Sequence, residues 1–319
     1  MEGTSTAIER LALAARQQIE KRVIGQSEMV EHCIVAILTG GHVLLEGVPG
    51  LAKTLLVKSI GELLRLRFQR IQATSDLMPA DLIGANVFNQ ASSSFHVHKG
   101  PIFADVLLVD EINRMPPRTQ AALLEAMEER QVTIDGTRCP LGQYFTVFAT
   151  QNPIEFEGTY PLPEAQLDRF LLKVIVPYPE EKDEVRILEL FEKGPAVEGR
   201  EAFAIEPLDP NLLAEARAQV SDIIVEPGLF EYMVRLVRAT RTAPQITLGA
   251  SPRAALNLAF VSKAFAALDE RGFVIPDDVK KAAIPVLRHR ITLQPEAQLE
   301  GLSTDQVLKE IVRTVAVPK

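Results

Sequence analysis

The sequence contains few cysteines and no long apolar run. Its two cysteines, Cys33 and Cys139, are far apart and match neither a metal-ligand nor a redox spacing. Unpaired thiols of this kind are typical of a reducing compartment. The longest uncharged apolar stretch, residues 33–45, is interrupted by two glycines and is too short to cross a bilayer. The first residues also lack the basic and apolar regions of a signal peptide. We therefore expect a cytoplasmic protein without membrane insertion.

An excess of basic charge is absent as well. The 34 lysines and arginines are outnumbered by 42 aspartates and glutamates, which gives a formal net charge of -8 at pH 7. A nucleic-acid surface would have to be a local patch working against this overall field, so we expect no nucleic-acid partner. The 319 residues, 47% of them hydrophobic, can bury a full core in one large domain or two modest ones.

The first half of the chain alternates short apolar runs with amphipathic segments. Strands that are apolar on both faces and joined by helices indicate a parallel sheet that is covered on both sides. We therefore predict an α/β fold. The expected strands are residues 42–45, 68–73, 106–109, 146–149 and 170–176.

Two segments interrupt this alternation. Residues 79–99 predict a short helix followed by a polar excursion, with a hairpin around the serines at 92–94. Residues 131–145 predict a second hairpin, because alternating side chains lead into Asp135-Gly136, which is a strong tight-turn dipeptide.

The composition changes after Val176. Pro177 and Pro179 stiffen the chain, and the segments that follow have helical periods and often begin with proline near the first turn. We predict an α/β domain over residues 1–179 and a smaller all-α domain over residues 180–319. The expected helices of the second domain are residues 180–193, 210–220, 227–242, 252–271, 276–287 and 303–315.

A glycine-containing loop lies between the first predicted strand and an amphipathic segment. Small residues let backbone N–H groups approach a phosphate, and the following helix adds its positive N-terminal end. Lys53 would contact the β- and γ-phosphates of ATP, and the Thr54 hydroxyl would bind Mg²⁺. Ala52 departs from the usual glycine before the lysine. The alternative is a Gly-Pro turn that precedes a lysine by chance, and the strand-loop-helix context disfavours it. The loop comprises Gly47, Val48, Pro49, Gly50, Leu51, Ala52, Lys53 and Thr54.

The third predicted strand ends in two adjacent carboxylates, Asp110 and Glu111. At the carboxyl end of a parallel strand, both side chains can lean over a nucleotide crevice. Asp110 would hold Mg²⁺, directly or through its water, and Glu111 would orient and deprotonate the attacking water. Taken alone, the pair fits the start of a solvated loop equally well. Together with the phosphate loop, it favours an ATPase.

Three further polar residues are weaker candidates. Asn152 would hydrogen-bond the attacking water or the γ-phosphate, although an asparagine before proline more often caps a turn. Arg169 is either an arginine finger for a neighbouring subunit's nucleotide or half of a surface pair with Asp168. Arg253, at the first turn of a predicted helix, either reaches the γ-phosphate or is a solvated charge.

Together these motifs resemble those of the AAA+ ATPases, and their individual residues resemble those of the MoxR subfamily. Ala52, the departure from the general phosphate-loop pattern, is what that subfamily shows. The resemblance covers nearly the whole chain from about Val23 and implies a P-loop core with a helical lid. The residues that carry it are 47–54, 109–114, 149–153 and 162–170.

The resemblance also implies roles for single residues. Val23 and Ile24 would line the adenine pocket, Asn152 would act as sensor 1, Arg169 as the arginine finger and Arg253 as sensor 2. It leaves open whether Arg253 serves its own subunit or a neighbour.

At the level of the whole molecule, the resemblance implies an insertion in the second helix at about 79–99 and an extra hairpin at about 131–145. Members form hexameric rings with nucleotide sites between subunits. They act as chaperone-like ATPases that remodel or activate a client, commonly with a partner that bears a von Willebrand factor A domain.

Three other functions stay open. A DNA-directed ATPase is disfavoured by the acidic charge and by the lack of a basic arm and of a Gly-Ala-Phe-Thr-Gly-Ala loop. A nucleotide-gated switch that hydrolyses slowly is disfavoured by Glu111. The ATPase subunit of magnesium chelatase, which shares the ring and the insertions, is a closer alternative.

Overall fold

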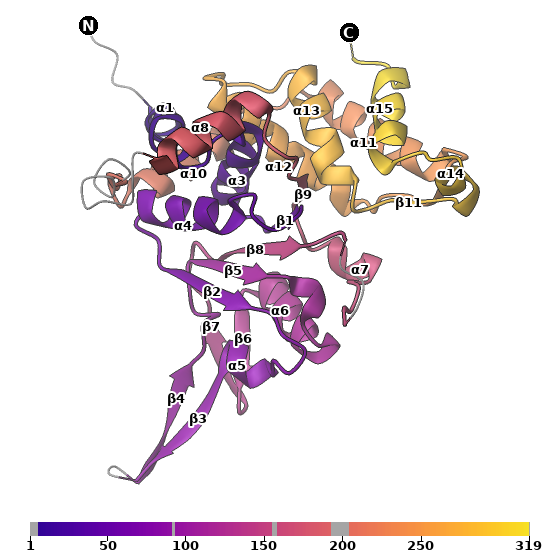
Figure 1. The fold of residues 1–319 in the computed structure, drawn as a ribbon. Helices are drawn as coiled ribbons and strands as arrows, with labels where there is room; N and C mark the ends of the chain where they lie inside the picture. Colours follow the sequence, from indigo (N-terminus) through magenta and orange to yellow (C-terminus); the bar gives the residue numbers. More distant parts are fainter. Residues whose placement is uncertain (1–5, 91–92, 155–157, 193–203, 319) are drawn as a thin grey trace, which may run out of the picture. The chain divides into compact units, whose positions relative to one another are not determined.

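The computed structural model describes residues 6–90, 93–154, 158–192 and 204–318 (Figure 1). By their contacts, these residues fall into two compact units. The sheet unit holds Ala14–Leu162 and Val174–Pro210, and the helical unit holds the chain up to Leu13, Pro163–Lys173 and the chain from Asn211 onward. This division differs from the single boundary expected after residue 179, which stays a prediction.

A five-stranded sheet forms the centre of the sheet unit, in the order β2-β5-β8-β1-β9. The pairs β2–β5, β5–β8 and β1–β8 are parallel, so the predicted α/β fold with a parallel sheet is confirmed. Their carboxyl ends lie side by side, because Glu46 pairs with Gln151 and Gln72 pairs with Asp110. The strands are β1 (Val43–Glu46), β2 (Phe68–Gln72), β5 (Val106–Asp110), β8 (Thr146–Gln151) and β9 (Leu172–Ile175).

Helices cover both faces of this sheet, which explains why its central strands are apolar throughout. Every residue of β5 is buried. Figure 1 shows α3 and α4 on one face and α6 on the other. The helical segments of the sheet unit are η1 (Ala15–Ile19), α2 (Glu20–Arg22), α3 (Ser27–Thr39), α4 (Lys53–Leu63), α5 (Pro79–Ile83), η2 (Ile112–Arg114), α6 (Pro117–Glu129) and α8 (Glu181–Glu192).

Helix α8 clusters with the sheet unit, although the sequence places it at the start of the all-α domain. Two close contacts explain this. The Gln26 side chain donates to the carbonyl of Pro177 at 2.9 Å, and any Cβ at Gly25 would meet Asp183 of α8 at 3.0 Å. A third contact, farther along the chain, is the hydrogen bond that the Leu208 N–H donates to the carbonyl of Leu63 at 2.8 Å.

The two segments that interrupt the alternation form antiparallel hairpins. The first consists of β3 (Gly84–Asn89) and β4 (Ser94–Lys99), and the second of β6 (Gln131–Ile134) and β7 (Thr137–Pro140). Asp135 and Gly136 form the second turn with φ angles of 45° and 82°. Strand β3 contacts β6, and both hairpins extend away from the sheet on the same side (Figure 1).

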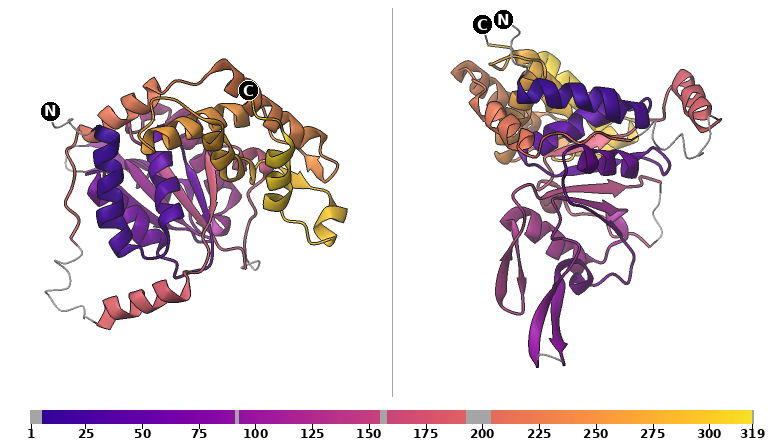
Figure 2. Two further views of the ribbon diagram at one scale, coloured as in Figure 1. Left: turned by 90° about the horizontal axis from the view of Figure 1, so that it is seen from above. Right: turned by 90° about the vertical axis from the view of Figure 1, so that its left-hand side faces the viewer.

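The helical unit is built around the pair α12 and α13, the orange and pale-orange helices of Figure 2. Helix α12 buries Leu258, Val261 and Phe265, and α15 begins at a capping box made by Ser303 and Gln306. Its elements are α1 (Ala7–Ala14), α7 (Glu164–Leu167), α10 (Leu212–Asp222), α11 (Pro227–Thr242), β10 (Ile246–Leu248), α12 (Arg253–Leu268), α13 (Pro276–Leu287), β11 (Thr292–Leu293), α14 (Pro295–Leu299) and α15 (Thr304–Thr314).

Among the residues that the structure describes, no helix is both long enough and apolar enough to span a bilayer.

Candidate functional site

A cavity of about 390 Å³ lies at the carboxyl ends of β1, β2, β5 and β8 in the sheet unit. Its floor is the loop between β1 and α4, and its walls are polar side chains at the ends of the other three strands. The parallel register brings these strand ends to one edge of the sheet, which is where ligands bind in open α/β sheets.

The loop that follows β1 has the backbone geometry of a phosphate cradle. Gly47 has to be glycine, because a Cβ there would meet the Val176 carbonyl at 2.9 Å. Gly50 takes a φ of 88°, which glycine adopts without cost. Ala52 has a φ of 57° and a ψ of 17°, and it immediately precedes the first turn of α4. The loop therefore accommodates the alanine methyl group in a left-handed conformation that costs about 1 kcal/mol.

Lys53 lies within the loop and contacts its backbone. Its ammonium donates to the carbonyls of Gly47 and Val48, the latter at 3.1 Å. Burial lowers the pKa of Lys53 below its ordinary value, and nearby carboxylates, foremost that of Asp110, act in the opposite direction. A lysine held in this way gains most from a ligand that brings negative charge to the cavity.

The Asp110 carboxylate is buried at the end of β5 and has three neighbours. Its Oδ2 lies 2.6 Å from Nε of Arg70 on β2 and 3.5 Å from the Thr54 hydroxyl on α4. Its Oδ1 accepts a hydrogen bond from the Thr150 hydroxyl of β8 at 3.3 Å. Residues from three other elements therefore hold one carboxylate in the wall of the cavity.

Glu111 takes a φ of 57° and a ψ of 52°, a conformation that is rare for a residue other than glycine. Its N–H donates to the Thr150 hydroxyl at 2.9 Å. Its Oε2 accepts from the Gln72 amide at 3.2 Å and lies 3.0 Å from Nε of Arg114. Backbone strain of this kind gathers at functional sites, where the surrounding contacts hold it in place.

The other candidates of the sheet unit are divided between the cavity and its surroundings. Asn152 lines the cavity, and its Oδ1 also accepts from the Ile154 N–H at 3.2 Å, so it caps its own turn as well. Val23 and Ile24 are buried in the turn before α3, and neither lines the cavity as the structure describes it.

Arg169 and Arg253 belong to the helical unit. Arg169 is half-buried after α7, and Arg253 is exposed at the first residue of α12. Asp168, which the alternative interpretation pairs with Arg169 at the surface, binds the buried Arg290 with 2.6 Å between Oδ1 and Nε.

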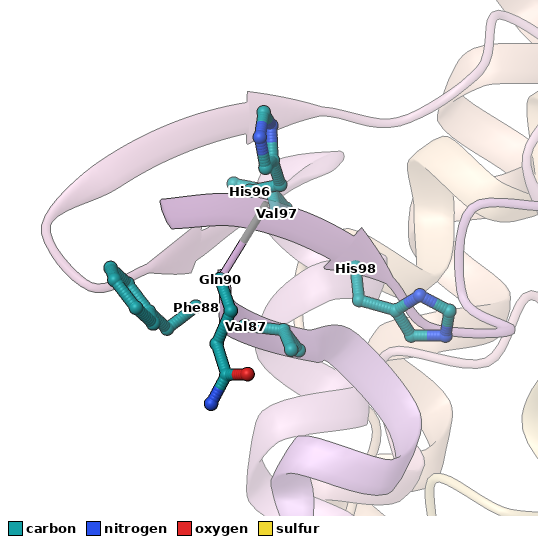
Figure 3. Close-up of a pocket in the computed structure, with 6 residues that line it drawn as sticks. All are labelled: Val87, Phe88, Gln90, His96, Val97 and His98. Atoms are coloured by element: carbon teal, nitrogen blue, oxygen red, sulfur yellow. The ribbon is translucent and has the colours of Figure 1, made fainter. Parts of the chain in front are cut away.

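A second hollow, about 530 Å³, lies on the β3–β4 hairpin (Figure 3). It is larger than the loop cavity, but its lining consists of the hairpin's own side chains, among them Phe88, His96 and His98. It contains no carboxylate and no phosphate loop. The loop cavity, in contrast, brings two carboxylates, a lysine and the glycine-containing loop together.

Comparison with known proteins agrees with this geometry. Residues 42–172 match the ATPase family associated with various cellular activities, and residues 238–311 match its AAA lid domain. The chain is 40% identical to the chaperone MoxR1 of Mycobacterium tuberculosis over 311 residues, which cover 95% of this chain and 81% of that protein. The chain belongs to the MoxR subfamily of AAA+ ATPases.

Two further relatives extend over almost the full length. The family includes an uncharacterized protein of Bacillus subtilis, YeaC, with 42% identity over 95% of this chain and 94% of that one. The crystal structure of a proposed ATPase from Cytophaga hutchinsonii superposes with a TM-score of 0.86 at 42% identity, covering 98% of both chains. The predicted family and the helical lid are thereby confirmed.

Three polar residues that line this family member's cavity were given no role from the sequence: Arg70, Gln72 and Thr150. Arg70 and Gln72 alternate on β2, which is an edge strand of the sheet and therefore tolerates polar side chains. Three polar residues, Gln69, Arg70 and Gln72, in a strand expected to be apolar on both faces were the available signal. Thr150 lies within residues 149–153, which carry the family resemblance, but only the order of the strands shows that it lies beside Asp110.

Proposed function

We propose that the chain binds Mg·ATP in the cavity behind β1 and hydrolyses it to ADP and phosphate. Membership of an ATPase family supports nucleotide binding. The single observation that carries the proposal is the convergence of the phosphate loop and Lys53 with Asp110 and Glu111 in one cavity. Each group has a part in phosphoryl transfer, and no other part of the described chain brings such groups together.

The loop would hold the β- and γ-phosphates. Its N–H groups and the N-terminus of α4 offer donors and a positive dipole, and Lys53 adds a full positive charge. The Lys53 ammonium donates to loop carbonyls, so phosphate oxygens at the same place would accept stronger, charge-assisted hydrogen bonds.

The residues present fit a magnesium ion. The Thr54 hydroxyl and an Asp110 carboxylate oxygen lie 3.5 Å apart, and both are hard oxygen ligands. Mg²⁺ usually takes one or two protein ligands and completes its shell with phosphates and water. The described residues accordingly include no group of three or more His, Cys, Asp or Glu side chains arranged for a metal. Thr54 and Asp110 would hold the ion, which would neutralise charge on the phosphates.

Glu111 would act as the general base. Its carboxylate takes a proton from the attacking water, the water oxygen bonds to the γ-phosphorus, and the bond from that phosphorus to the β–γ bridging oxygen breaks. Gln72 and Arg114 hold Oε2 of this carboxylate. Asn152 would orient the same water or the γ-phosphate as sensor 1.

We propose further that the active form is a hexameric ring. Arg169 would be an arginine finger for a neighbouring subunit's nucleotide and Arg253 would be sensor 2, with Val23 and Ile24 at the adenine. The motif resemblance supports these roles, and the position of both arginines in the helical unit is compatible with them.

The resemblance and the name of MoxR1 also support a chaperone-like motor that remodels a client. We propose a partner with a von Willebrand factor A domain, a cytoplasmic location and no nucleic-acid partner. Cys33 is buried and unpaired, and Cys139 is free as well, as expected of a reducing compartment. If a DNA-directed function held instead, DNA would stimulate turnover.

Lys53→Ala tests the proposal by isothermal titration with Mg·ATP and by phosphate release. The variant removes a charge at the phosphates and no core volume, so we expect it to fold and to lose nucleotide binding or turnover. Lys58→Ala is the matched control, because Lys58 is exposed on the same helix α4 and pairs only weakly with Glu62. Equal binding and turnover in both variants would refute the assignment of the phosphate loop.

A further inference from the structure

The segment that carries Arg169 is fastened to the end of α13. The three consecutive residues that follow α13 all contact the Arg169 segment. Arg288 donates to the carbonyl of Lys173 at 3.3 Å, and His289 contacts the carbonyl of Phe170 at 2.9 Å. Arg290 binds Asp168. All of these residues belong to the helical unit. Arg169 is thus placed by its neighbours in sequence on both sides.

Arg290 makes the strongest of these contacts. Its side chain is 1% exposed. Nε lies 2.6 Å from Asp168 Oδ1, Nη2 donates to the Asp168 carbonyl at 3.1 Å and Nη1 donates to the Leu171 carbonyl at 3.2 Å. The guanidinium therefore grips the backbone on both sides of Arg169, and its planar fork, unlike a lysine ammonium, fixes the direction of each bond.

The same carboxylate reaches the segment that carries Arg253. Asp168 Oδ2 accepts a hydrogen bond from the Ser251 hydroxyl at 3.0 Å, two residues before Arg253 at the start of α12. Burial lowers the pKa of Arg290 to about 10, and the positive charge of Arg253 contributes in the same direction.

We infer that Arg290, Asp168 and Ser251 form a positioning triad that holds Arg169 and Arg253 in one fixed relation, so that the helical unit presents both arginines as a pair. This rests on the proposed function. A surface pair between Asp168 and Arg169 would fix the position of neither Arg169 nor Arg253. The Asp168 carboxylate, however, binds both the buried guanidinium of Arg290 and the Ser251 hydroxyl just before α12. It therefore connects the two segments that carry Arg169 and Arg253. Misplacing a charge at the γ-phosphate by about 1 Å costs up to ~10²-fold in rate.

Ser251→Ala tests the triad with little risk to the fold, because Ser251 is only partly buried and Asp168 keeps its pair with Arg290. We expect the maximal rate of ATP hydrolysis to fall about tenfold. The affinity for a non-hydrolysable ATP analogue should change by less than about twofold, because ground-state binding is retained. Ser251→Thr, which keeps the hydroxyl and suits the position before a proline, should restore the rate.

Ser262→Ala is the matched control, since Ser262 is buried on helix α12, which follows Ser251, and its hydroxyl has no hydrogen-bond partner in the described structure.

A second comparison sets Arg290→Lys against Arg271→Lys. Arg271 also binds an aspartate with two hydrogen bonds, of 2.7 and 2.6 Å to Asp278, but it contacts neither candidate arginine segment. We expect Arg290→Lys to lower the turnover rate at least about tenfold more than Arg271→Lys does, in a comparison where the two variants have equal melting temperatures.

Two results would overturn the inference: equal turnover of Ser251→Ala and Ser262→Ala, or an equal loss from Arg290→Lys and Arg271→Lys. Wild-type protein is measured in the same assay, so the two proposals can be separated. Absence of wild-type hydrolysis would refute the proposed function. Wild-type hydrolysis that the triad variants leave unchanged would refute the triad alone.

Discussion

The cavity depends on two residues in left-handed backbone conformation, Ala52 and Glu111, each with a φ of 57°. Neither is glycine, so each costs about 1–2 kcal/mol that neighbouring contacts must offset. Ala52 is followed directly by α4, and the Glu111 N–H is held by Thr150. The two strained positions lie where a phosphate and a water would be bound, which is the usual place for such strain.

Among single residues, Thr150 is the one to change in order to test how the site is held. Its hydroxyl accepts from the Glu111 N–H and donates to the Asp110 carboxylate, so one oxygen holds both the backbone of Glu111 and the side chain of Asp110. Thr150→Val keeps the shape of the side chain and removes both bonds. We expect turnover to fall about 10–100-fold, the range for residues that orient metal ligands, while the nucleotide still binds.

The measurement is steady-state phosphate release together with analogue binding. Thr146→Val is the control, because Thr146 is buried on the same strand and its hydroxyl donates only to the neighbouring Tyr144 carbonyl at 3.0 Å. If both variants kept the wild-type rate, Thr150 would be a packing residue and the two carboxylates would be oriented by other contacts.

The residues of the phosphate loop and the Asp-Glu pair could be predicted because each motif is contiguous in sequence and follows an apolar strand. Arg70 and Thr150 could not, because their importance depends on strand order. The sequence does not show that β8 lies between β1 and β5, and only this order brings Thr150 beside Asp110. The link from Arg290 to Asp168 spans 122 positions and has no local pattern.

Among the elements, the central parallel strands β1, β5 and β8 were the most predictable, because they are almost wholly buried and largely apolar. The short strands β10 and β11 were not predicted. They contain two or three residues each, and β10 pairs with β11 across a bulge, so they carry no alternation of their own. Helix α8 was predicted as a helix, whereas its association with the sheet unit depends on Gly25 and Asp183, which no periodicity reveals.

The end of α13 gives a prediction for stability against pH. His289 is buried, and its pKa lies well below the ordinary value because burial, and then the charge of Arg290, disfavours the protonated ring. In the unfolded chain its pKa returns to about 6.5. Below that pH the unfolded state binds a proton that the folded state does not, so the free energy of unfolding falls as pH falls, by up to about 1.4 kcal/mol per unit.

His289→Gln should therefore lose less stability than the wild type between pH 7 and pH 5.5, as measured by urea unfolding. The amide can still donate to the Phe170 carbonyl. The control is His96→Gln on the exposed strand β4, which should keep the wild-type dependence. A wild-type slope in His289→Gln would mean that other groups cause the loss of stability in acid.

For the whole molecule, the proposed function involves an ATPase site in the sheet unit and two arginines, Arg169 and Arg253, in the helical unit. If those arginines complete a neighbour's site, bound ATP is an interface ligand and favours assembly by mass action. Glu111→Gln keeps the shape of the side chain and loses the base, so it should trap the ATP-bound assembly. Light scattering of this variant with Mg·ATP should give a mass near six subunits. A strictly monomeric species at high concentration would contradict the ring.

The most direct test of the central claim is phosphate release by the wild type and Glu111→Gln under the same conditions, with bound ATP measured in parallel. We expect repeated turnover by the wild type. The variant should bind Mg·ATP and hydrolyse it at least about 10²-fold more slowly, because the general base is lost. Glu125→Gln, on the exposed face of α6, should keep the wild-type rate. Equal rates for the wild type and Glu111→Gln, or a wild type that binds ATP without hydrolysing it, would contradict the account.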